Sequence, residues 1–106
     1  MKTINLDYTA AVPLDRAVLE VMHPFFSEHY GNPSSGHNLG LIPRKALDEA
    51  REKVSRLIGA QPRDLIFTAS ASEANNLAVK GFLAANKNKG NHIIASSIEH
   101  FSIINQ

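Results

Sequence analysis

Three side chains of this sequence, Ser70, Ser72 and His100, could do chemistry close together. Ser70 and Ser72 lie between a short apolar run, residues 65–69, and a segment rich in helix-favouring residues. This order predicts a strand, a tight turn and a helix with Ser72 as its N-cap. The free amides of the first helical turn, the two hydroxyls and the positive end of the helix dipole then favour an anion, most simply a phosphate. The alternative is a plain N-cap with nothing bound.

His100 follows a second short apolar run, residues 92–96, which predicts a second strand. Two strands joined by a helix form a right-handed crossover, so the two strands are expected to be parallel. Ligands collect at the carboxyl ends of parallel strands, which places His100 on the same side as the phosphate-like site. The alternative is a histidine that only caps a helix or makes a local hydrogen bond.

Composition excludes several other classes of function. With 106 residues, 43% hydrophobic and 20% charged residues, the chain is typical of one globular domain or a piece of one. A net charge of +1 gives no footprint for nucleic acid or an anionic membrane, and no apolar run could cross a bilayer. The N-terminus lacks the pattern of a secretory signal, so we expect a cytoplasmic protein.

Metal and covalent chemistry are not indicated either. The chain has no cysteine, which removes disulfides, thiolate metal sites and a cysteine nucleophile from this segment. None of its five histidines has a metal-ligand spacing, so no metal is expected. No Gly-x-Ser-x-Gly elbow surrounds Ser70 or Ser72, and neither is predicted to be a nucleophile.

Two helices should precede these elements. The first is capped by Asp15, should bend or break near Met22 because of Pro24, and buries one apolar stripe. The stripe consists of Val18, Leu19, Met22, Phe25 and Phe26. The second is expected to run from Pro43 to about Ile58 and to end at Gly59 in a left-handed conformation. The loop of turn-forming residues between them, residues 30–37, is either a surface connection or a place where backbone approaches a partner closely.

Four segments, in this order and spacing, resemble the N-terminal quarter of a cysteine desulfurase. They are Asp7-Tyr8, the Tyr30-Gly31-Asn32-Pro33-Ser34-Ser35-Gly36-His37 loop, the Phe67-Thr68-Ala69-Ser70-Ala71-Ser72-Glu73-Ala74-Asn75-Asn76 segment, and the His92-Ile93-Ile94-Ala95-Ser96-Ser97-Ile98-Glu99-His100 segment. Cysteine desulfurases of the NifS and IscS kind are pyridoxal-phosphate (PLP) enzymes of the class-V aminotransferase family. The resemblance covers essentially the whole chain.

The resemblance implies the fold. It predicts an α/β protein, the incomplete N-terminal part of the aspartate-aminotransferase-like (fold type I) large domain, with three α/β/α layers. Residues 1–14 would form an N-terminal arm, and residues 15–106 the start of the large domain. In the family, later strands insert between the two strands expected here, so without them both would expose unpaired edges and apolar faces, which favours aggregation.

The resemblance also implies site residues. Ala71 and Ser72 stand where the family binds the cofactor phosphate through backbone N–H groups and a hydroxyl. His100 stands where the family's histidine stacks on the pyridine ring and assists proton transfer, which makes it the candidate catalytic residue. The family usually has Gly at the position of Ser70 and Thr at that of Ser72; serine keeps the hydroxyl, but losing glycine restricts the turn.

The activity implied is removal of sulfur from L-cysteine, giving L-alanine and an enzyme persulfide for iron–sulfur cluster or thiolation pathways. Expected partners are a second copy, as a homodimer, and a sulfur-acceptor or scaffold protein. The family's Schiff-base lysine and nucleophilic cysteine have no counterpart in these residues, so the chain alone is predicted to be inactive. Two alternatives remain: another class-V PLP enzyme, such as a selenocysteine lyase or an aminotransferase, and a non-catalytic chain that binds a phosphate or a partner.

Overall fold

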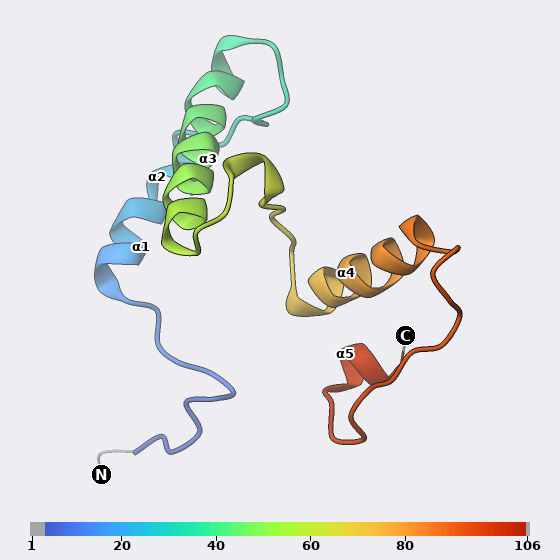
Figure 1. Cartoon of the computed structure of the whole chain (residues 1–106). Coiled ribbons are helices and arrows are strands. Elements are labelled where there is room, and N and C mark those ends of the chain that lie inside the picture. The colour runs from blue at the N-terminus through green and yellow to red at the C-terminus, as the bar shows by residue number, and fades with distance from the viewer. Residues whose placement is uncertain (1–3, 106) are drawn as a thin grey trace. The chain divides into compact units, whose positions relative to one another are not determined.

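The computed structural model describes residues 4–105, and the chain divides after Leu65 into two compact units (Figure 1). The regular structure of residues 4–105 is entirely helical. The first unit contains α1 (Arg16–Met22), α2 (Pro24–Ser27), α3 (Asn38–Leu57) and a short 3-10 helix, η1 (Pro62–Asp64); the second contains α4 (Ala71–Ala85) and α5 (Phe101–Ile104). None of these helices is long and apolar enough to cross a membrane.

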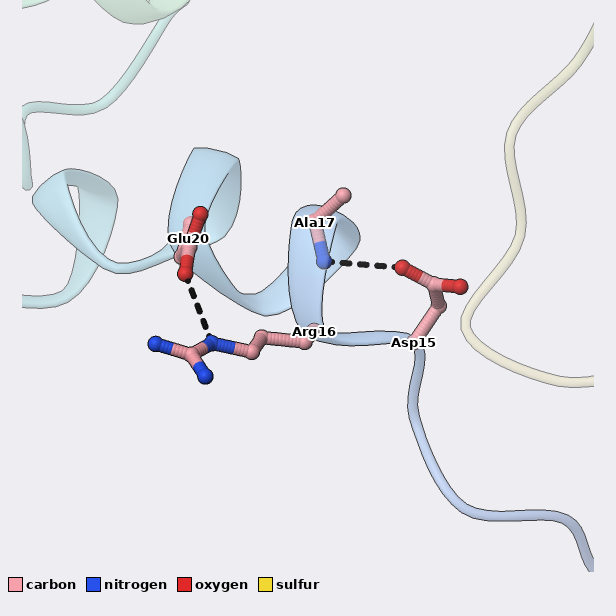
Figure 2. Close-up of polar contacts among 4 residues, drawn as sticks. All are labelled: Asp15, Arg16, Ala17 and Glu20. Atoms are coloured by element: carbon pink, nitrogen blue, oxygen red, sulfur yellow. Dashed lines mark hydrogen bonds and ion pairs between the residues drawn. The ribbon is translucent and has the colours of Figure 1, made fainter.

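Helix α1 begins at the cap that the sequence predicts. The Asp15 carboxylate accepts a hydrogen bond from the Ala17 amide at 2.8 Å, and Arg16 pairs with Glu20 one turn later at 3.0 Å (Figure 2). The helix ends at Met22, and Pro24 is the first residue of α2. The predicted break at this proline is therefore confirmed. The first three residues of the expected arm lie outside the described part of the chain.

The apolar stripe of α1 and α2 is less buried than expected. Phe25 is half-buried, whereas Phe26 keeps 71% of its surface exposed. A hollow of about 400 Å³ separates Val21, Met22 and Phe25 from residues 46–53 of α3. Among residues 4–105 no hydrophobic side chain is fully buried, so the prediction of a buried apolar stripe is wrong.

Helix α3 begins at Asn38, five residues before the predicted start at Pro43. Pro43 lies inside the helix, where it has no N–H to donate to the Leu39 carbonyl four residues earlier. The backbone of Gly31 passes this same carbonyl so closely that an added Cβ would lie 1.9 Å from the Leu39 oxygen. The predicted start at Pro43 is therefore wrong. Proline suits the first turn of a helix, but α3 accepts the loss of one hydrogen bond at Pro43 and begins earlier, at Asn38.

The loop before α3 packs its backbone against the helix. Gly40 is buried, and a Cβ placed there would lie 2.6 Å from the carbonyl oxygens of both Asn32 and Ser35. Arg44 donates from Nε to the Pro33 carbonyl at 2.7 Å. The small residues of this loop therefore allow close approach to the chain's own helix.

The predicted left-handed end of α3 is confirmed. Gly59 has φ +69°, its amide donates to the Arg56 carbonyl at 3.4 Å, and the Ala60 amide donates to the Ser55 carbonyl at 2.9 Å. These two bonds form a Schellman motif, which satisfies carbonyls that the helix end would otherwise leave open.

The two predicted strands do not form in this structure. Residues 65–69 and 92–96, on either side of α4, have no strand pairing, and Ile94 keeps 89% of its surface exposed. An extended segment becomes a strand only when a neighbour supplies the hydrogen-bond ladder, and the residues described here supply none between these two segments. The α/β class expected from sequence is thus represented only by its helices.

Candidate functional site

The first turn of α4 is held by Ser70, not by Ser72 as predicted. Ser70 is extended at φ −159° and ψ 161°, and its hydroxyl accepts from the Glu73 amide at 3.2 Å. The Glu73 carboxylate reaches back and accepts from the Ala69 amide at 2.7 Å. This pair resembles a capping box, whose signature is a serine followed three residues later by a glutamate. The spacing was present in the sequence, and the prediction placed the cap two residues too late.

With Ser70 as the cap, Ser72 becomes a helical residue of the first turn. Its carbonyl accepts from the Asn76 side chain at 2.9 Å, and its hydroxyl makes no hydrogen bond with any described residue. The amides of Ala71 and Ser72 likewise have no acceptor within residues 4–105, and both residues are exposed. Two N–H groups and one hydroxyl are thus available at the positive end of a 15-residue helix.

Glu73 works against an anion at this place. It is the acidic residue of the first turn, and a carboxylate beside a phosphate repels it. The bond from the Ala69 amide occupies one carboxylate oxygen and holds the side chain back toward the residues that precede the helix. The Ala71 and Ser72 donors therefore stay uncovered.

His100 is the N-cap of α5. Capping is the alternative to ligand binding that the sequence leaves open for this histidine. Its Nδ1 accepts from the Ser102 amide at 3.1 Å and lies 2.9 Å from the Ser102 hydroxyl oxygen. Because a backbone amide can only donate, Nδ1 carries the lone pair, and the proton of the neutral ring is on Nε2. The ring is exposed, and its centroid lies 6.3 Å from that of Phe101.

Two residues that sequence reasoning did not identify connect His100 to α4. The Asn75 side-chain amide donates to the Ser102 hydroxyl at 2.8 Å, and both residues are half-buried. Asn75 lies one turn beyond Ala71 and Ser72. A serine two residues after His100 is a visible signal for a local cap, but a bond across 27 positions leaves no local signature.

Two hollows of the second unit lie away from these residues. A groove of about 540 Å³ is lined by apolar side chains of α4 and by His92, Ile93 and Ile94, and one of about 470 Å³ runs from Val79 to Glu99 and Ile103. Neither is lined by Ala71, Ser72 or His100, and all three of these residues are exposed. Residues 4–105 contain no cluster of side chains suited to a metal ion.

Comparisons with known proteins agree over most of the chain. The profile of the aminotransferase class-V family matches residues 4–106. The chain is 48% identical over 99 residues to cysteine desulfurase IscS 1 of Archaeoglobus fulgidus, covering 93% of this chain and 26% of that protein. It is 46% identical to cysteine desulfurase IscS of Dictyoglomus turgidum, with 97% of this chain and 26% of that protein covered.

Solved structures give the same relationship. A NifS-like protein superposes with a TM-score of 0.85 at 34% identity, over 93% of this chain and 27% of that one. A structure described as SspA in complex with cysteine superposes with a TM-score of 0.88 at 40% identity, over 97% and 30%. The chain spans about a quarter of the length of the curated relatives it matches. On this evidence the chain belongs to the aminotransferase class-V family, whose members in general depend on PLP.

Proposed function

We propose that this chain supplies the N-terminal part of a PLP-dependent cysteine desulfurase. The enzyme would remove sulfur from L-cysteine, giving L-alanine and an enzyme persulfide for iron–sulfur cluster or thiolation pathways. The observation that carries the proposal is the open first turn of α4, with the Ala71 and Ser72 donors, in a chain that is 46–48% identical to IscS relatives.

The residues present fit the phosphate group of the cofactor. Two adjacent amides and a hydroxyl at a helix N-terminus match the acceptors of a phosphate, and the helix dipole favours its charge. The glycine usual in the family at the position of Ser70 is not required for this arrangement, because Ser70 is extended and its hydroxyl caps the helix. Serine at position 72 keeps the donor that threonine has in the family.

The bound cofactor would supply an electron sink that makes the bonds of the substrate amino acid easier to break. The chain's own residues would bind and orient the cofactor: Ala71 and Ser72 would hold the phosphate, and His100 would bind the pyridine ring. With Nδ1 engaged by Ser102, His100 presents its proton at Nε2. His100 is therefore the proposed catalytic residue, as a group that holds or passes a proton at that atom.

The finer features of the fold belong to the same proposal. Residues 1–14 would be an N-terminal arm and residues 15–106 the start of a three-layer α/β/α, fold type I large domain. The segments 65–69 and 92–96 would become strands of its sheet once further strands pair with them. A homodimer, a sulfur-acceptor or scaffold partner and a cytoplasmic location are further parts of this proposal.

The test uses the full product of the gene that encodes this chain. We expect the purified protein to carry the visible absorption of bound PLP and to release equimolar alanine and sulfide from L-cysteine in the presence of a reductant. Ser72→Ala should weaken PLP binding, and Ser72→Thr should preserve it. A product that binds no PLP would contradict the proposal.

The same preparation separates the two alternatives. A selenocysteine lyase would release selenide from L-selenocysteine and leave L-cysteine intact, and an aminotransferase would pass the amino group to a keto acid without releasing sulfide. A chain that binds inorganic phosphate but neither PLP nor an amino acid would be a non-catalytic binding protein. Each result points to one class only.

A further inference from the structure

The hydrogen bonds around His100 run in one direction, from α4 to the imidazole. The Asn75 Nδ2 group can only donate, so the Ser102 hydroxyl oxygen accepts from it at 2.8 Å with a lone pair. The hydroxyl can in turn donate to His100 Nδ1, 2.9 Å away, which also accepts from the Ser102 amide. Nδ1 therefore faces two donors, whereas Nε2 has no hydrogen-bond partner among the described residues.

An exposed histidine without such partners rotates and exchanges its proton between the two nitrogens. Ser102 opposes both changes, because turning the ring or moving its proton to Nδ1 would give up the bonds from the amide and the hydroxyl. Asn75 adds a second constraint, because it ties Ser102 to the first half of α4. The same helix carries the Ala71 and Ser72 donors at its start.

We propose that Ser102 and Asn75 are positioning residues that hold His100 as the Nε2–H tautomer at a fixed place relative to the first turn of α4. The role assigned to this tautomer in holding the cofactor ring rests on the proposed function, but the tautomer itself does not. Ser102 determines which ring nitrogen of His100 carries the proton. Asn75 fixes the distance between the first turn of α4, which would hold the phosphate of PLP, and His100, which would bind its ring.

The experiment measures the tautomer directly, by ¹⁵N NMR of the ring nitrogens in histidine-labelled full gene product, stripped of cofactor. We expect His100 to show a protonated Nε2 and an unprotonated Nδ1. Ser102→Ala keeps the backbone amide and loses the hydroxyl, so the Nε2–H to Nδ1–H ratio should fall roughly three- to tenfold, the value of one hydrogen bond. Ser102→Thr keeps the hydroxyl and should restore the ratio.

A second variant reverses the direction of the hydrogen bond between residue 75 and Ser102 and keeps a side chain of nearly the same shape. In Asn75→Asp the carboxylate accepts the Ser102 proton, which the hydroxyl then no longer gives to Nδ1. The tautomer ratio should shift toward Nδ1–H. The matched control is Asn86→Asp at the other end of α4, where the side chain donates to the Phe82 carbonyl; it should leave the His100 signals unchanged. Far-ultraviolet circular dichroism confirms that each variant folds.

The outcomes are distinct. A wild-type His100 with mixed tautomers, or Ser102→Ala and Asn75→Asp spectra identical to wild type, would overturn the proposal whatever the activity. A correct tautomer pattern in a protein without desulfurase activity would overturn the proposed function and leave the positioning role intact. With PLP restored, Ser102→Ala should also shift the absorption band of the bound cofactor, and Ser102→Thr should return it.

Discussion

Ser70 and Glu73 close the start of α4 between them, the serine hydroxyl accepting from the Glu73 amide while the Glu73 carboxylate accepts from the amide before Ser70. This arrangement occupies the backbone amides of Ala69 and Glu73. It leaves the amides of Ala71 and Ser72 uncovered. Capping and ligand binding are thus assigned to neighbouring but different groups, and substitutions can separate them.

Ser70→Ala and Ser72→Ala should therefore have opposite signatures. Loss of the Ser70 cap should lower the free energy of unfolding by about 0.5–2 kcal/mol, as for other N-caps, whereas Ser72→Ala should change it little. Loss of the Ser72 hydroxyl removes a bond to a charged group and should weaken PLP binding roughly tenfold or more. Denaturant unfolding and PLP titration of the full gene product measure the two effects.

The controls are Ser70→Asn, which can still cap, and Ser72→Thr, which keeps the hydroxyl. If Ser72→Ala destabilised the helix as strongly as Ser70→Ala while leaving PLP affinity unchanged, the assignment of ligand binding to Ser72 would be wrong.

Gly31 should tolerate no side chain. A Cβ at this position would lie 1.9 Å from the Leu39 carbonyl oxygen, a backbone atom that cannot turn away, so Gly31→Ala must shift the loop or the start of α3. Overpacking of this kind costs about 1–3 kcal/mol. We expect a lower thermal unfolding midpoint for this variant.

Gly36→Ala is the matched control, because nothing lies within 4 Å of its added Cβ. It should unfold close to wild type. Equal stability of the two variants would show that the loop does not pack against α3 as described.

Sequence reasoning succeeded where the determinants are local. The Asp15 cap, the break at Pro24 and the Gly59 end each depend on a few neighbouring residues. It failed where the outcome depends on distant partners. The strands at 65–69 and 92–96 need a ladder from other strands, and the Asn75–Ser102 bond joins two helices 27 positions apart. The start of α3 lies between these cases, because the loop that packs on it comes just before it.

The two glycines at 59 and 81 should respond to alanine in opposite directions. Gly59 has φ +69°, a region that costs an L-residue roughly 1–2 kcal/mol, so Gly59→Ala should destabilise the end of α3. Gly81 lies within α4 with nothing within 4 Å of an added Cβ. Gly81→Ala should stabilise that helix by about 0.5–1 kcal/mol. Chemical unfolding curves report both signs, and a stabilising Gly59→Ala would contradict the Schellman end.

Segment 92–96, which forms no strand in this structure, predicts how residues 1–106 behave when they are expressed alone. With no ladder hydrogen bonds, the amides of residues 92–96 should exchange with deuterium as fast as those of an unfolded chain, while amides in the middle of α3 exchange more slowly. Exposed Ile94 and Ile98 should bind a dye that reports apolar surface and promote aggregation. Replacing Ile94 with Lys should reduce both dye binding and aggregation, whereas the same change at the exposed polar Asn88 should not. Slow exchange in 92–96 of the isolated chain would mean that these residues pair within residues 1–106, and the α/β sheet would then begin without further strands.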